Sequence, residues 1–312
     1  GLDGVVRLHF TVSAEHLELF KAQFAAWQET LAAAYGCHFE VSYSTQKAST
    51  DTLALDAKDQ PLRDSEGRLV LRPGGHGALI KNLNDLSGDI VLIRNIDNVV
   101  PDVHKEANLT WAKLLTGYLV TLQEEQHALL KALHDHPEDP MTRELAVCFL
   151  GDRLQLDVSL FDDSQTLLDK LDRPIRVCGM VPNSGEPGGG PFWVRSSDGR
   201  VTRQIVEGAQ IDKSDPEQAK ILAGSTHFNP VDMVCGVSDW RGRPYDLNRF
   251  VDEDAVIITS KRMEGQELKV LELPGLWNGA MAGWHTLFVE IPPEAFNPVK
   301  TVFDLLRPAH QA

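Results

Sequence analysis

The sequence has no surplus of basic residues and no long apolar run. It holds 30 Lys and Arg against 45 Asp and Glu, a formal net charge of −15. The chain therefore has no excess positive charge to neutralise the phosphates of a nucleic acid, so a nucleic acid is excluded as the main partner. A small anionic ligand is not excluded, because it needs only a local cluster of donors. The apolar stretches are far shorter than the roughly 20 residues of a membrane span, and no signal-peptide pattern is visible.

Cysteine is scarce, and the common catalytic signatures are missing. The four cysteines, Cys37, Cys148, Cys178 and Cys235, show no CxxC spacing, and each lies in an apolar context. We therefore expect buried, reduced thiols, which argues against a disulfide scaffold or a zinc site and favours a cytoplasmic protein. The absence of a GxSxG elbow, a Walker loop and an HExxH motif argues against the enzyme classes that depend on them.

The chain contains alternating strand and helix patterns in its first half and mainly strand patterns in its second. A strand at 5–12, a helix from 13 to about 35 and a strand at 38–44 follow from residue periodicity. Residues 45–70 are predicted to be irregular, apart from a strand at 69–71, and a buried strand is expected at 90–93. Further helices are expected at 103–133, 140–150, 164–171 and near 299–306, and strands at 175–181, 191–195, 201–206, 233–237, 255–259 and 287–291.

This order of elements predicts an α/β fold, a three-layer sandwich around a mostly parallel mixed sheet. We expect a single domain over residues 1–312, in which 103–171 form a helical insertion. Ligands of such sheets bind outside the carboxyl ends of the strands. The residues after Ile93 are therefore the first place to look for a site.

Two short motifs stand at ends of predicted strands. Residues 73–77, PGGHG, open a helix, where glycines admit a ligand close to the backbone and the helix offers free N–H donors, and His76 is expected to be exposed on this turn. A tight strand-to-helix turn with a capping His is the alternative. Residues 95–98, NIDN, supply the oxygen ligands that Mg²⁺ prefers. Alternatively, Asp97 and Asn98 cap the next turn.

Three weaker candidates complete the set. The glycine-rich segment 184–191 could admit a sugar ring, with Glu186 accepting from its hydroxyls, or be a hairpin loop. The run from His134 to His136 resembles a metal-chelating sequence, but its acidic, proline-terminated context favours a solvated helix end. Lys269 and the pair at 261–262 could serve phosphates, although lysines are common on surface strands.

Read in order, these segments resemble the eukaryotic-type UDP-sugar pyrophosphorylases, both the UDP-glucose and the UDP-N-acetylglucosamine branches, and more closely a bacterial family of unknown function in the same superfamily. The likeness is carried by Gln46, PGGHG and NIDN. It implies that Gly75, His76 and Gly77 lie against the uracil and ribose, and that Asp97 binds the catalytic Mg²⁺. The resemblance also places Gln46, Gly74 and Asn95 at the nucleotide.

Later segments extend this resemblance. RQIVEGAQID at 203–212 is similar to the family strand whose Glu holds sugar hydroxyls, and HFNPVDMVCGV at 227–237 to the segment whose Asn contacts the sugar. AFNPVKTVFDLL resembles the element whose Lys reaches phosphate, which implies a catalytic role for Lys300. The implied sugar-binding residues are Glu186, Gly189, Glu207 and Asn229.

The family resemblance implies a nucleotide-diphospho-sugar transferase (GT-A-like) fold and conversion of an NTP and a sugar 1-phosphate into an NDP-sugar and pyrophosphate. The implied partners are a small-molecule nucleotide and a sugar phosphate. The chain begins too late for the family's first strand and its Gly-rich phosphate loop, so we expect this truncated form to be inactive and the full-length protein to be a uridylyltransferase. The alternatives are a non-catalytic nucleotide-sugar-binding or regulatory domain and a metal-dependent glycosyltransferase.

Overall fold

The computed structural model describes residues 3–56, 58–158, 163–183, 185, 188–195, 199, 201–263 and 266–311. The chain divides into two compact units. Unit 1 comprises residues 1–86 and 253–280, and unit 2 comprises residues 87–252 and 281–312. That residues 1–312 form a single domain stays a prediction, and each unit is described by itself.

Unit 1 begins with a strand, a helix and a second strand, as the periodicity predicts. β1 (Val5–Thr11) and β2 (His38–Ser44) pair in parallel, and α1 (Leu17–Tyr35) makes the crossover that parallel strands require. The helix ends at Gly36 in the left-handed conformation, φ 61°, the usual glycine stop. Phe20 and Phe24 of α1 contact Phe10 and Phe39 of the strands, so the apolar stripe of the helix faces this pair.

A second sheet of unit 1 has the order β10–β11–β3–β4, all antiparallel. Its strands are β10 (Ile257–Met263), β11 (Gln266–Glu272), β3 (Thr52–Asp56) and β4 (Leu71–Arg72). The prediction that residues 45–70 are irregular is wrong for β3. This five-residue strand is held by β11, more than two hundred positions away, where Leu268 pairs with Asp56. The short helix α2 (Ile80–Asn84) follows the glycine turn.

The central sheet of unit 2 has the order β12–β6–β9–β5. Its strands are β12 (His285–Glu290), β6 (Ile175–Pro182), β9 (His227–Gly236) and β5 (Ile90–Arg94). β6 is parallel to β12, and β9 is antiparallel to both β6 and β5, so β5, β6 and β12 run in one direction. The sheet is therefore mixed, as expected from the sequence, but only β6 and β12 pair in parallel, so the expectation of a mostly parallel sheet is wrong for these strands.

Another expected feature of the sheet needs correction. The described strands do not join into one sheet: they form four, because β1 pairs with β2 and β7 (Gly190–Arg195) pairs with β8 (Val201–Val206) as separate ladders. Periodicity reports that a segment is a strand but carries no information about its partner. The three-layer, GT-A-like arrangement stays a prediction.

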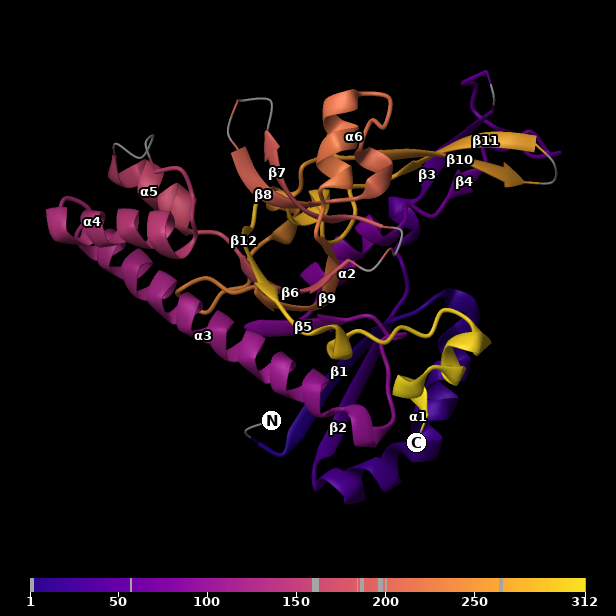
Figure 1. The fold of residues 1–312 in the computed structure, drawn as a ribbon, viewed down its shortest axis with the longest axis horizontal. Coiled ribbons are helices and arrows are strands. Elements are labelled where there is room, and N and C mark those ends of the chain that lie inside the picture. The colour runs from indigo at the N-terminus through magenta and orange to yellow at the C-terminus, as the bar shows by residue number, and fades with distance from the viewer. Residues whose placement is uncertain are drawn as a thin grey trace. The chain divides into compact units, whose positions relative to one another are not determined.

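Three helices within residues 103–171 build the hydrophobic core of unit 2. α3 (Glu106–Asp135) packs against β6 and β9, with α4 (Pro140–Cys148) and α5 (Ser164–Leu171) against its C-terminal half (Figure 1). Leucines of α3 at helical spacing meet Phe149, Val177, Val234 and Leu287. The segment predicted as an insertion therefore supplies core packing. No helix in the described part of the chain is long and apolar enough to cross a membrane.

One further helix was missed. α6 (Pro216–Ala223) begins after Asp215, whose carboxylate accepts from the Glu217 and Gln218 backbone N–H groups. An N-cap Asp followed by Pro at the first helical position is a recognised start signal. The sequence therefore contained the signal for this helix, although the helix is short.

The four cysteines are free, as expected, but they differ in burial. Cys178 and Cys235 are buried on β6 and β9, and burial raises the pKa of the Cys178 thiol to about 11. Cys148, at the end of α4, is exposed, so the prediction of four buried thiols is wrong there. α4 turns only part of its surface toward the core, and Cys148 lies outside that part.

Truncating a core leucine of α3 tests this packing. Leu130 is 1% exposed, so Leu130→Ala should lower the free energy of unfolding by about 2–5 kcal/mol, because it leaves a cavity. Leu145→Ala, at a position of α4 that is 52% exposed, is the control and should change stability by less than about 0.5 kcal/mol. Urea unfolding followed by circular dichroism measures both, and equal effects would contradict the assignment of the core.

Candidate functional site

The polar residues that follow β5 meet the C-terminal segment of the chain. Asn95 is exposed, Asp97 is half-buried, and the Asp97 carboxylate forms an ion pair with the Lys300 ammonium. The side chain of Asp97 is 24% exposed and that of Lys300 is 67% exposed. The sequence predicted separate roles for these residues, a metal ligand and a phosphate contact, and the structure brings the two together.

Asn98 holds the C-terminal segment against the end of β5. The buried Asn98 side chain donates from Nδ2 to the Ala295 carbonyl oxygen at 3.0 Å and accepts at Oδ1 from the Asn297 N–H at 2.8 Å. The Val299 N–H then donates to the Asp97 carbonyl oxygen at 2.9 Å. We call these three contacts the Asn98 clamp. Asn98 thus positions the chain that carries Lys300.

The backbone of Lys300 is also fixed on its C-terminal side. The Lys300 and Thr301 N–H groups donate to Oδ2 of Asp304 at 2.9 Å and 2.7 Å. Asp304 is buried, and hydrogen bonds from the Thr301 and Lys300 backbone lower the pKa of its carboxyl group. Thr301 and Asp304 form a capping box that starts the 3₁₀ helix Val302–Leu306, the short helix expected near 299–306.

A buried carboxylate that the sequence analysis missed lies on the neighbouring strand. Asp232 of β9 is 0% exposed, and Arg94, the last residue of β5 and its register partner, donates from Nε to Oδ1 at 2.6 Å. Burial raises the pKa of Asp232, and the charge of Arg94 opposes that rise. Its Oδ2 has no hydrogen-bond partner among the described residues. The sequence feature that could have indicated this residue is an Asp within the apolar run of β9.

The strand register puts two predicted groups at one end of the unit 2 sheet. Because β9 is antiparallel to β5 and Asp232 lies opposite Arg94, the residues after Arg94 and the residues of β9 before Asp232, which still pair with β6, lie toward the same edge of the sheet. Asp97 and Asn229 therefore share that edge. It is also the carboxyl edge of β6 and β12, where ligands of such sheets bind.

Three of the predicted sugar-binding residues converge in unit 2. A Cβ on Gly189 would lie 2.9 Å from Asn229 Oδ1, 2.9 Å from the Glu207 Cα and 2.2 Å from the Val206 carbonyl oxygen, so the backbone approaches as only glycine allows. Asn229 Oδ1 is buried and has no hydrogen-bond partner among the described residues. The Glu207 carboxylate caps a 3₁₀ turn by accepting the Gln210 N–H. The predicted Glu186 lies outside the described residues.

In unit 1 the glycine turn is held by Gln46. With its amide oriented to satisfy both groups, Gln46 accepts from the Gly74 N–H at 2.9 Å and donates to the Gly75 carbonyl oxygen at 3.3 Å. Gly75 has φ +78°, a left-handed conformation that favours glycine, and a Cβ on Gly74 would lie 2.4 Å from the Thr50 carbonyl oxygen. Gln46 and the turn were predicted to act together, and the structure joins them.

His76 and Gly77 pack against a segment that the sequence analysis did not single out. The His76 Nδ1 accepts a hydrogen bond from the Leu276 N–H at 3.0 Å. The imidazole stacks on the Trp277 ring, with the ring centroids 5.0 Å apart. A Cβ on Gly77 would lie 2.0 Å from the Pro274 carbonyl oxygen. The prediction of an exposed His76 is therefore wrong, because the ring is half-buried and packs against residues far away in sequence.

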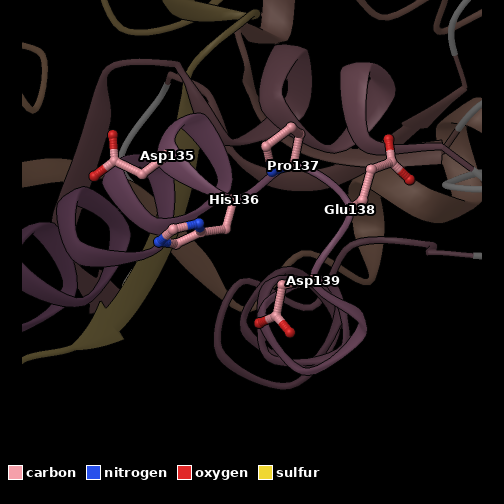
Figure 2. A pocket seen from close by; sticks show the side chains of 5 residues that line it. All are labelled: Asp135, His136, Pro137, Glu138 and Asp139. Carbon is pink, nitrogen blue, oxygen red and sulfur yellow. The ribbon is translucent and has the colours of Figure 1, made fainter.

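The acidic connection after α3 is not a metal site. Asp135, His136, Pro137, Glu138 and Asp139 line a hollow there, and Figure 2 shows the three carboxylates pointing in different directions. Asp139 instead caps α4 by accepting the Thr142 N–H at 2.9 Å. In the described part of the chain, no group of three His, Cys, Asp or Glu could hold a metal ion. The interpretation as a solvated helix end fits these observations.

Of the remaining lysine and arginine candidates, Lys269 pairs with Asp59 in unit 1 at 2.7 Å. The side chains of Lys261 and Arg262 lie outside the described set. The candidate residues thus form two groups: Gln46 and the glycine turn in unit 1, and the charged and polar residues described above in unit 2.

The Asn98 clamp predicts a local effect of mutation. Asn98→Ala should lower stability by about 1–3 kcal/mol, because the Asn297 N–H loses its acceptor and the Ala295 carbonyl oxygen loses a donor. Residues 295–306 should then exchange amide hydrogens faster, as measured by hydrogen–deuterium exchange mass spectrometry. Asn95→Ala, at an exposed position, is the control. Unchanged exchange in Asn98→Ala would contradict the clamp.

Comparisons with known structures find crystal structures of UDP-glucose pyrophosphorylase from Leishmania major. One variant in complex with UDP-glucose is 16% identical with a TM-score of 0.45, and another is 16% identical with a TM-score of 0.48; each match covers 97% of this chain and 54% of the other. A candidate UDP-N-acetylglucosamine pyrophosphorylase from Entamoeba histolytica is 12% identical, with a TM-score of 0.44 and coverage of 95% and 61%. This chain therefore spans just over half the length of the Leishmania proteins.

Sequence comparisons give a family but no characterised relative. No curated protein matches the chain. A family model described as "Domain of unknown function (DUF4301)" matches residues 2–311, almost the whole chain, and the protein belongs to that family.

Proposed function

We propose that this protein binds a nucleotide sugar together with Mg²⁺, at the carboxyl edge of the unit 2 sheet. The observation that carries the proposal is the Asp97–Lys300 pair. A carboxylate and an ammonium held side by side supply the two charges that a metal-bound diphosphate needs, one for the cation and one for the phosphate oxygens.

The residues present fit a magnesium ion. Asp97 is a half-buried carboxylate, and its charge is already balanced by a cation, the Lys300 ammonium. A metal ion could replace the ammonium as the partner of this carboxylate. Mg²⁺ is commonly held by one or two carboxylates and by substrate phosphates. Asp97 would hold the ion, which would supply positive charge to offset the charge of a bound phosphate.

The polar groups of the same unit suit a sugar. Asn229 Oδ1 is buried with no partner among the described residues, and an acceptor in that state is stabilised by a ligand hydroxyl.

The reaction that these residues support is nucleotidyl transfer between a sugar 1-phosphate and an NTP. It needs no protein nucleophile, since the sugar phosphate oxygen attacks the α-phosphorus in line. Lys300 would hold phosphate oxygens, Asn229 would orient the sugar, and catalysis would follow from positioning and charge neutralisation. Pyrophosphate exchange with UDP-glucose separates this reaction from binding without catalysis.

Thermal-shift titration with UTP, UDP-N-acetylglucosamine and UDP-glucose, each with and without Mg²⁺, tests the binding proposal. A ligand at a hundred times its Kd stabilises the folded state by about 2.7 kcal/mol. We expect a Mg²⁺-dependent rise in melting temperature that Asp97→Ala abolishes. The control is Asp102→Ala, which breaks the exposed Asp102–Lys105 pair of the same unit and should keep the rise. No shift with any of the three ligands would refute the proposal.

A second variant tests the sugar contact. Asn229→Ala should weaken UDP-glucose binding by about tenfold, because one buried hydrogen bond is worth about 1.4 kcal/mol. UTP binding should stay within about twofold of the unmodified protein, since UTP has no sugar at the position of the glucose. Calorimetric titration measures both affinities, and an equal loss for the two ligands would place Asn229 away from the sugar.

A further inference from the structure

The carboxylate that would bind the metal already has a cation as its partner. Lys300 lies 203 positions after Asp97 and forms an ion pair with it. Neighbouring charges have partners of their own. Arg94 donates to Asp232, and Arg307 pairs with Asp304 at 2.7 Å. The pairing of Lys300 with Asp97 is therefore specific, because the neighbouring side chains of Arg94 and Arg307 form ion pairs with other carboxylates.

The backbone of Lys300 is fixed, while its ammonium is not. The Asn98 clamp holds the segment on one side, and the Asp304 carboxylate accepts the Lys300 N–H on the other. The Lys300 side chain is 67% exposed, so its ammonium can move through solvent about the bonds of a flexible four-carbon chain. A change of partner at Asp97 therefore requires rotation of one side chain and no movement of the backbone.

An ion pair of this exposure is weak enough to be exchanged. The Asp97 carboxylate is partly exposed and the ammonium mostly so, a setting in which ion pairs contribute little and are screened by salt. A divalent cation carries twice the charge of the ammonium and coordinates the carboxylate directly. Both cations compete for one carboxylate, and the displaced ammonium keeps its charge.

We propose that Lys300 and a divalent cation are mutually exclusive partners of Asp97, and that arrival of the cation frees the Lys300 ammonium to bind a phosphate. The inference rests on the proposed function, because the phosphate is that of the nucleotide. The exchange makes Lys300 available when the metal is present and blocks it otherwise. By linkage, phosphate on Lys300 must also favour metal on Asp97.

The exchange predicts two effects that a structural role of the pair does not. First, Lys300→Met should bind Mn²⁺ about fivefold more tightly than the unmodified protein, because the competing ammonium is gone. Lys300→Arg, which retains the charge, should bind Mn²⁺ as the unmodified protein does. Second, with no metal present, Asp97→Asn should bind pyrophosphate about fivefold more tightly, because Lys300 is released from its partner.

Electron paramagnetic resonance of free Mn²⁺ during a titration measures the first effect; the Mn²⁺ binding that remains in Asp97→Asn is subtracted. Calorimetry with pyrophosphate measures the second effect. Lys105→Met, which removes a lysine from the exposed pair with Asp102, is the matched control and should change neither affinity. Unchanged or weaker Mn²⁺ binding in Lys300→Met would overturn the exchange, as would unchanged or weaker pyrophosphate binding in Asp97→Asn. Both effects without any affinity for UDP-sugars would support the exchange and refute the proposed function.

Discussion

The hydrogen bonds of the Asn98 side chain are the interaction on which the candidate site depends. They join the end of β5 to Ala295 and Asn297, which lie 197 and 199 positions further along the chain. They act together with the Val299 N–H bond to the Asp97 carbonyl oxygen and the Asn108 Nδ2 bond to the Ala295 carbonyl oxygen in holding the segment that carries Lys300 next to Asp97. A buried amide suits this task, because it can donate and accept at once and leaves neither of its backbone partners unsatisfied.

The two glycine-rich motifs show how packing and binding can require the same residues. Gly77 meets the Pro274 carbonyl oxygen and Gly189 meets the Val206 carbonyl oxygen, each at a distance that forbids a Cβ. Part of the reason for glycine is therefore close contact between backbone segments of the protein itself. Next to Gly189, Asn229 Oδ1 is buried and has no hydrogen-bond partner in the described part of the chain.

Most helices and strands could be predicted, because periodicity and caps are local. The parallel βαβ start of unit 1 and the long α3 follow from residue spacing, whereas β3 depends on β11, a strand more than two hundred positions away. Within the site, Gln46 contacts the glycine turn, and Gly189, Glu207 and Asn229 lie together, while their roles in binding stay predictions. Asp232 was missed because an acid within an apolar strand leaves no periodic signal.

By itself the sequence determined the order of the elements, the position of the NIDN motif at a strand end and the identity of the side chains available for binding. Only the tertiary structure decided their partners. It paired Lys300 with Asp97, assigned Asn98 to the clamp and packed His76 against Trp277. The physical reason is that local spacing constrains dihedral angles over a few residues, while ion pairs and buried hydrogen bonds depend on which distant segments pack together.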